Sequence, residues 1–183
     1  LPVHELENSL LDENALAGCD LNSHGRSAPQ IAARLRHEAG LYEWHTCVCH
    51  VLAEWRRLFA SDFPSHPPRH VTTDHATAMA YLRSFPWYQE AAARGGQVSN
   101  TQGLAASLTA AHRYVTLWLT GETWKREFCG KKIFHEIRGY IYRQPAGSVG
   151  VGTGDSNVDV ARSVGAWQRQ NNAVPQEIHD LRR

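Results

Sequence analysis

The stretch 41-LYEWHTCVCHVLAEWRRLF-59 decides the expected fold. Its apolar residues recur three or four positions apart, which is the spacing of one stripe along an α-helix. The members of this stripe are Leu41, Trp44, Val48, Leu52, Trp55 and Phe59. Charged residues such as Glu54, Arg56 and Arg57 fall outside the stripe. The pattern therefore predicts an amphipathic helix over 41–59 that packs on one side.

The same helical spacing recurs on both sides of this stretch. A shorter helix is expected over 29–37, with Ser27 as its N-cap and Gly40 at its end. Further helices are expected over 73–86 with Thr73 or Asp74 as the cap, over 100–121, over 122–142 with a break or kink at Gly130, and over 158–170. The alternation that marks strands is nearly absent. The sequence therefore predicts an all-α protein.

Length and composition restrict the class of protein. The chain has 183 residues, enough for one domain or two small ones, and its six Trp, six Tyr and five Phe exclude collagen-like and disordered chains. No run of about 18 apolar residues is present, so no membrane span is expected. The first residues lack the pattern of a signal peptide, and four Cys are too few for a disulfide scaffold. We therefore expect an intracellular protein of a reducing compartment, such as the cytoplasm, nucleoid or nucleus.

Charge is distributed unevenly along the chain. Residues 1–25 carry five acids and no Lys or Arg, whereas residues 26–145 carry fifteen Lys or Arg and nine acids. A basic middle behind an acidic head favours a polyanionic partner, although ordinary variation in surface charge fits equally well. Residues 144–157 are Gly-rich, which is typical of a linker. The predicted segments are an acidic extension (1–26), a helical domain (27–143), a linker (144–157) and a C-terminal helix with a tail (158–183).

Three motifs contain residue types that carry chemistry. The motif His45-Thr-Cys47-Val-Cys49-His50 offers zinc-binding side chains, but two Cys two positions apart on a helix point in different directions, so no metal is predicted. The Gly150–Gly154 run lacks the preceding strand of a dinucleotide-binding loop, so no cofactor is predicted. Acid–base groups are also present, but their spacing fixes no geometry and no catalytic residue is assigned. These groups are His50, His66, His70, His75, Asp62 and Asp74.

Cations and amides on the helical faces are the candidates for nucleic-acid contacts. Lys and Arg neutralise phosphates, and Asn or Gln at a helix N-terminus reaches base edges in the major groove. The candidate DNA-binding residues are Arg56, Arg57, Asn100, Gln102, Arg113, Lys125, Arg126, Lys131, Lys132 and Arg138. The same residues are also consistent with solvated helical faces that bind nothing.

The order of caps and helices resembles the N-terminal core-binding (SAM-like) domain of tyrosine recombinases and phage integrases. In that family a Trp/Phe-rich helix precedes a helix with a Thr-x-x-Asp cap, and a later helix begins at a polar turn. The resemblance covers roughly residues 30–145 and rests on 47-CVCHVLAEWRRLF-59, 71-VTTDHATAMAYLR-83, 99-SNTQGLAASLTAAHRYVTLWL-119 and 134-FHEIRGYIYR-143. It implies a compact helical bundle that clamps one side of a DNA duplex, with helices in the major groove.

The catalytic domain of the same family offers a competing alignment. His135 and Arg138 have its His-x-x-Arg spacing, and Trp167 lies about where the family places a second His or Trp. The nucleophilic Tyr should follow shortly after, but the last Tyr of this chain is Tyr142, so no phosphotyrosyl intermediate is expected. The resemblance therefore implies non-covalent DNA binding without a catalytic tyrosine or a cofactor.

Two other classes of function remain open. A helical accessory subunit of a large assembly would bury its Trp residues on partner proteins. A small nuclease toxin is suggested by fragments around His45, His50 and Trp118 that are similar to ribonuclease-like contact-inhibition toxins. That toxin family needs an antiparallel sheet near its C-terminal end, for which the Gly-rich segment of this chain provides no pattern.

Overall fold

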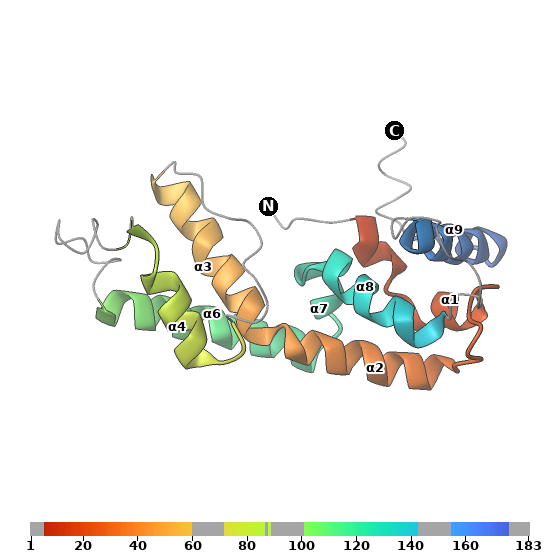
Figure 1. Cartoon of the computed structure of the whole chain (residues 1–183), viewed down its shortest axis with the longest axis horizontal. Helices are drawn as coiled ribbons and strands as arrows, with labels where there is room; N and C mark the ends of the chain where they lie inside the picture. The colour runs from red at the N-terminus through yellow and green to blue at the C-terminus, as the bar shows by residue number, and fades with distance from the viewer. Residues whose placement is uncertain (1–5, 60–71, 87, 89–100, 143–154, 176–183) are drawn as a thin grey trace. The chain divides into compact units, whose positions relative to one another are not determined.

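The computed structural model describes residues 6–59, 72–86, 88, 101–142 and 155–175. Helices make up the regular structure of this described part, and no strand occurs within it (Figure 1). The expected all-α class is therefore confirmed at the level of secondary structure. The SAM-like core-binding type remains a prediction.

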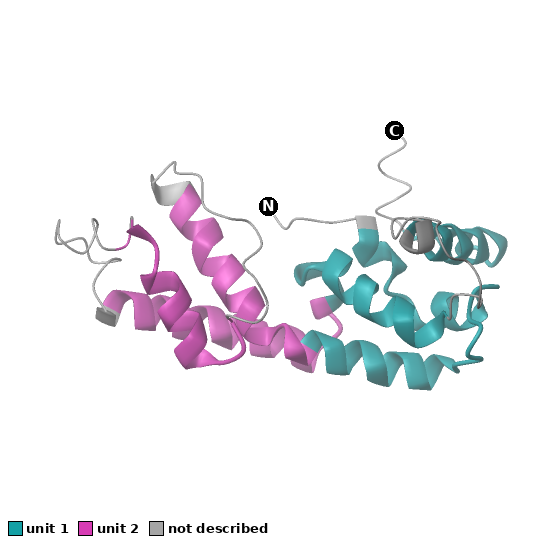
Figure 2. Ribbon diagram, viewed as in Figure 1, with its two compact units in different colours: residues 1–39, 125–183 teal, residues 40–124 magenta. Residues whose placement is uncertain are grey.

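The chain forms two compact units, which Figure 2 shows in different colours. Unit 1 comprises Leu1–Ala39 and Lys125–Arg183, and unit 2 comprises Gly40–Trp124. These units group the residues differently from the four predicted segments, because the two ends of the chain belong to the same unit. The predicted acidic extension and the predicted C-terminal helix therefore share a unit with part of the predicted helical domain.

Unit 2 is built on helices α3 (Glu43–Phe59) and α6 (Thr101–Thr120), which pack against each other. The predicted apolar stripe of α3 supplies buried side chains that include Val48, Leu52 and Trp55. The buried side chains of α6 fall at the predicted steps of three and four residues, at Leu104, Leu108, Ala111 and Val115. Helical periodicity therefore located both helices and much of their buried faces. The prediction was wrong for Leu41, which is the last residue of α2 and is exposed, because α3 begins only at Glu43.

Helix α4 (His75–Arg83) also belongs to unit 2 and begins at one of the two predicted caps. The Asp74 carboxylate accepts a hydrogen bond from the Thr77 N–H at 2.8 Å, and the Thr77 hydroxyl accepts one from the Asp74 N–H at 3.0 Å. These reciprocal bonds form a capping box. The bond from the Thr77 backbone holds the pKa of the exposed Asp74 carboxyl below its usual value, because it favours the charged form.

Unit 1 contains the N-terminal segment as part of its core. Residues 6–18 form the 3-10 helix η1 (Leu6–Leu10) and helix α1 (Glu13–Gly18). Helix η1 packs against α8 (Gly130–Ile141), and α1 packs against α9 (Asp155–Gln170). The segment predicted from its charge as an extension buries Leu10, Leu11, Ala15 and Leu16. A count of charges contains no information about these apolar residues, so charge alone does not predict that the segment packs in a core.

The remaining helices of unit 1 overlap their predicted ranges, but α2 continues past residue 37 through Gly40, so the predicted end at this glycine was wrong. Helix α2 (Ala28–Leu41), whose residues 28–39 belong to unit 1, begins directly after Ser27. The N–H and the hydroxyl of Ser27 both donate to the Gln30 side chain. Helix α7 (Trp124–Glu127) ends shortly before α8 begins, so the expected break lies directly before Gly130. Helix α9 begins at Asp155 rather than at 158, and residues 144–154 of the predicted linker lie outside the described residues.

Gly130 is required at its position because Asn8 of η1 lies against it. A Cβ added at Gly130 would overlap the Asn8 side chain and the Asn8 backbone nitrogen. The backbone nitrogen can move only if η1 moves, so a side chain at this position would push η1 away from α8. Gly18 has a similar role in α1, since a Cβ there would overlap the Trp167 indole of α9.

We predict that Gly130→Ala lowers the free energy of unfolding by about 1–3 kcal/mol, the usual cost of overpacking. The matched control is Gly139→Ala in the same helix, where an added Cβ meets no atom within 4 Å. The control is expected to stabilise the protein by up to about 1 kcal/mol, because alanine is the better helix former. Urea unfolding followed by circular dichroism measures both variants. Equal effects of the two substitutions would contradict the close contact between Asn8 and Gly130.

Candidate nucleic-acid interface

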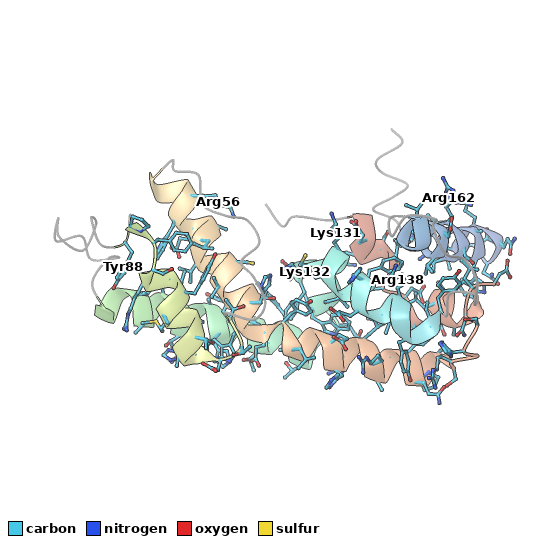
Figure 3. All side chains as sticks on the ribbon, viewed as in Figure 1. Arg56, Tyr88, Lys131, Lys132, Arg138 and Arg162 are labelled. Carbon is cyan, nitrogen blue, oxygen red and sulfur yellow. The ribbon has the colours of Figure 1, made fainter. Side chains whose placement is uncertain are left out.

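The ten predicted DNA-contact residues divide equally between the two units. Unit 2 holds Arg56, Arg57, Asn100, Gln102 and Arg113. Unit 1 holds Lys125, Arg126, Lys131, Lys132 and Arg138. Figure 3 labels Arg56, Lys131, Lys132 and Arg138 on the helices that carry them. Each unit therefore carries its own half of the predicted set.

Two of the unit 2 candidates have described side chains. Arg56 is half-buried on α3, and its Nε atom is fully covered. Arg113 is exposed on α6. Because its guanidinium is partly covered, Arg56 offers a phosphate less area than Arg113 does. Asn100 lies outside the described residues, as do the side chains of Arg57 and Gln102.

In unit 1, four of the predicted cations lie on α7 and on the first turn of α8, on either side of the turn that joins these helices. We name Lys125, Arg126, Lys131 and Lys132 the basic corner. Arg126 and Lys131 are exposed, and Lys125 and Lys132 are half-buried. Figure 3 shows Lys131 and Lys132 at the N-terminal end of α8. These four cations and one acid, Glu127, fall within residues 125–132, and the excess of positive charge attracts anions.

The side chain of Asn8 holds this turn together. Its Nδ2 atom donates to the carbonyls of Lys125 at 2.8 Å, Arg126 at 3.0 Å and Phe128 at 3.0 Å. These carbonyls lie at the end of the short helix α7, where C=O groups lack partners within the helix. Gly130 lies against the same side chain. The backbone of residues 125–130 therefore folds around Asn8, which fixes how α7 leads into α8.

Helix α8 extends the positive charge away from the basic corner. Lys131, His135 and Arg138 are four and three residues apart, so they lie on one face of the helix. Lys131 and His135 are exposed and Arg138 is half-buried, whereas the opposite face buries Ile133, Phe134, Ile137 and Ile141. The N-cap residue Cys129 makes no side-chain capping hydrogen bond. The positive end of the helix dipole adds to the charge of the basic corner.

An acidic side chain lies beside the basic corner. The Oε2 atom of Glu13, the first residue of α1, is 2.9 Å from the Nζ atom of Lys125. The two side chains are 29% and 25% exposed, respectively. Acids and cations that occupy separate parts of the sequence are therefore in contact in the fold. Sequence reasoning missed this ion pair because no local pattern relates residues 112 positions apart.

Two further arginines of unit 1 were not among the predicted residues. The guanidinium carbons of Arg26 and Arg34 lie 4.5 and 5.6 Å from the centroid of the Tyr140 ring, within the range of a cation–π contact. Arg26 also donates from Nε to the Tyr140 carbonyl at 3.4 Å, and Arg34 forms an ion pair with the buried Glu38 at 2.6 Å. These contacts join Arg26, which precedes α2, and Arg34 of α2 to α8 or to Glu38. Both guanidinium groups therefore already have partners within unit 1.

Unit 2 contains a polar cluster that sequence reasoning also missed. The Nε2 atom of His112 lies 2.9 Å from Oε1 of Glu43, which also accepts a hydrogen bond from the Thr116 hydroxyl at 3.3 Å. The His112 ring stacks on the Trp44 indole, with 4.2 Å between centroids and 5° between planes. His75 of α4 meets the Trp44 ring edge-on. The cluster therefore ties α3, α4 and α6 together.

The acid–base groups noted in the sequence contact different aromatic residues. His75 contacts Trp44, whereas His50 contacts Tyr114 and Trp118. Asp74 caps α4 instead of pairing with a histidine. Asp62, His66 and His70 lie outside the described residues. The described geometry therefore adds no catalytic assignment to these groups.

The cysteines lie in or near the cores of the two units. Cys19 and Cys47 are buried, Cys49 and Cys129 are half-buried, and all four are reduced thiols. Burial raises the pKa of Cys47 to about 12 and raises the pKa of Cys19 above its usual value. Within the described ranges, no group of three or more His, Cys, Asp or Glu side chains is arranged to hold a metal ion.

Comparisons with protein families, curated proteins and solved structures find no match to this chain. In the part of the chain that the structure describes, no helix combines the length and apolar character needed to cross a membrane. The nuclease-toxin alternative expects an antiparallel sheet, and no strand occurs in the described ranges. Function is therefore inferred from the residues of the chain and their geometry.

We predict that Cys19 and Cys47 resist alkylation by iodoacetamide at about pH 8, because the thiolate is the reactive form and burial disfavours it. Cys49 and Cys129 are expected to react at least about tenfold faster, since their thiols are partly accessible. Peptide mass spectrometry after timed alkylation gives the four rates, and urea-unfolded protein gives the reference. Fast labelling of Cys47 in the folded protein would contradict its burial in the core of unit 2.

Proposed function

We propose that the protein binds duplex DNA non-covalently, mainly through phosphates that contact the basic corner and the Lys131–Arg138 face of α8. The observation that carries this proposal is the run of four cations on α7 and the first turn of α8, where Asn8 holds the connecting backbone. Neighbouring cations neutralise consecutive phosphates and release their counterions, which supplies most of the affinity for nucleic acid. The N-terminal end of α8 adds a further favourable field for an anion.

Duplex DNA is the proposed polyanion because the order of caps and helices resembles the core-binding domains of tyrosine recombinases. In this proposal Arg113 contributes a phosphate contact from unit 2, and Asn100 and Gln102 reach base edges near the start of α6. Arg56 and Arg57 remain predicted phosphate contacts on α3. The proposal assigns non-covalent contacts alone to the residues of this sequence.

The test is the affinity of the double variant Lys131→Glu/Lys132→Glu for a random-sequence duplex, measured by fluorescence anisotropy from about 50 to 300 mM salt. Reversing two charges at the basic corner is expected to weaken binding at least about tenfold near 100 mM salt. The slope of log affinity against log salt should become shallower by about 0.9 for each phosphate that the variant no longer neutralises. Circular dichroism confirms that the variant is folded.

The matched control is Arg162→Glu/Arg169→Glu on α9 of the same unit, which changes the net charge equally. Arg162 is 78% exposed and is labelled in Figure 3. This control should weaken binding much less, because its cations lie outside the proposed surface. Equal weakening in the two variants would show that the affinity depends on net charge alone. That result would contradict a binding surface at the basic corner. A wild-type protein that does not bind at about 50 mM salt would overturn DNA binding itself.

A second candidate function, a subunit of a larger protein assembly, is favoured by exposed apolar side chains on α6. Tyr114 is 56% exposed and Leu117 is 66% exposed, and they lie three positions apart on one side of the helix. Large exposed Trp side chains are not found among the described residues. Among the described ones, Trp55 and Trp124 are buried, and Trp44, Trp118 and Trp167 are half-buried.

If α6 contacts a protein partner, a photo-crosslinking residue at position 117 should join the chain to a discrete partner in its host cell. The same residue at position 109 is the control, because Thr109 is exposed on a different side of α6. Mass spectrometry identifies the crosslinked species. A product formed equally at both positions, or at neither, would contradict a specific contact through Tyr114 and Leu117.

A further inference from the structure

The ion pair between Glu13 and Lys125 joins α1 to the basic corner. Its two charged atoms are 2.9 Å apart, and about three quarters of each side chain is covered. Partial burial strengthens such a pair, because water and salt screen it less than they screen an exposed pair. One of the four cations proposed to meet phosphate is therefore already in contact with a carboxylate of the same chain.

Packing determines where the Glu13 carboxylate lies. The Asp12 side chain caps α1 by accepting hydrogen bonds from the N–H groups of Asn14 at 2.8 Å and Ala15 at 3.2 Å. Ala15 and Leu16 of the same helix are fully buried. Just before α1, Asn8 is bound to the backbone of the turn that carries Lys125. Glu13 is therefore held beside the lysine by the fold, and only a rotation of the side chains separates the two charges.

We propose that Glu13 is an intramolecular competitor of DNA phosphate at Lys125 and thereby lowers the affinity of the basic corner for DNA. This inference rests on the proposed DNA binding. A phosphate contacts Lys125 only after it displaces the carboxylate, and the displaced Glu13 then stands near a second anion, which repels it. The energy gained from the ion pair between phosphate and Lys125 is offset by the loss of the ion pair between Glu13 and Lys125. Lys125 therefore adds little to the affinity of the wild-type protein for DNA.

The same competition changes how binding depends on salt. A cation that neutralises a phosphate releases the counterions condensed on DNA, which steepens the dependence of affinity on salt. While Lys125 stays paired with Glu13, it neutralises no phosphate and releases no counterion from the DNA. The slope measured for the wild-type protein therefore omits the contribution of Lys125 to the extent that Glu13 occupies it. A purely structural role for Glu13 would leave the slope unchanged.

The test is Glu13→Gln, which removes the competing charge and keeps the size of the side chain. For a random-sequence duplex near 100 mM salt, affinity should rise about two- to fivefold, the range expected when an ion pair of this kind no longer has to be broken. The slope against log salt should steepen by up to about 0.9. The matched control is Asp20→Asn, an acid-to-amide change at an exposed position after α1, which should change both quantities little.

A double-mutant cycle isolates the pair from the rest of the surface. In the background Lys125→Gln, adding Glu13→Gln should bring no gain in affinity, because the competitor then has no lysine to occupy. A gain of the same size with and without Lys125 would overturn the inference and leave DNA binding standing, as would identical effects of Glu13→Gln and Asp20→Asn. Absence of duplex binding by the wild-type protein and by all of these variants would instead overturn the proposed function.

Discussion

The hydrogen bonds from Asn8 to the α7–α8 turn are the contact on which unit 1 depends. One carboxamide serves three carbonyls that α7 leaves without partners inside the helix, and the same side chain fills the space that Gly130 leaves open. Covered carbonyls without partners cost free energy, so removing Asn8 would penalise the turn as well as η1. The cations of the basic corner and the position of Glu13 both follow from this contact.

The helices of this protein could be predicted because their signals are local. The three- and four-residue steps in 41–59 and in 104–119 reflect faces that α3 and α6 bury, and the capping box at Asp74 needs only the four residues that form it. The break before Gly130 is local as well, since glycine is a poor helix former. Positions within one or two helical turns of each other therefore carry most of the information that a single sequence offers.

The pairing of these helices could not be predicted, because it depends on contacts between distant positions. Asn8 is an ordinary polar residue in the sequence, and its three acceptors lie more than 110 positions away. The contacts of His112 with Glu43 and Trp44 cannot be predicted locally either, because these two residues lie on another helix. The charge of the N-terminal segment predicts an extension, whereas the burial of its Leu residues determines where the segment packs.

Segment charge is therefore a poor guide to where this chain meets an anion. Arg34 and Lys125 both belong to the basic middle of the sequence, yet each forms an ion pair within unit 1, with Glu38 and with Glu13. Fields of exposed charges are largely screened beyond about 8–10 Å at physiological salt, so a phosphate responds to the few groups at one turn. A carboxylate in contact with one of these cations, as Glu13 is with Lys125, consequently changes binding more than acids far from the turn do, which is why the ion pair and the basic corner have to be understood together.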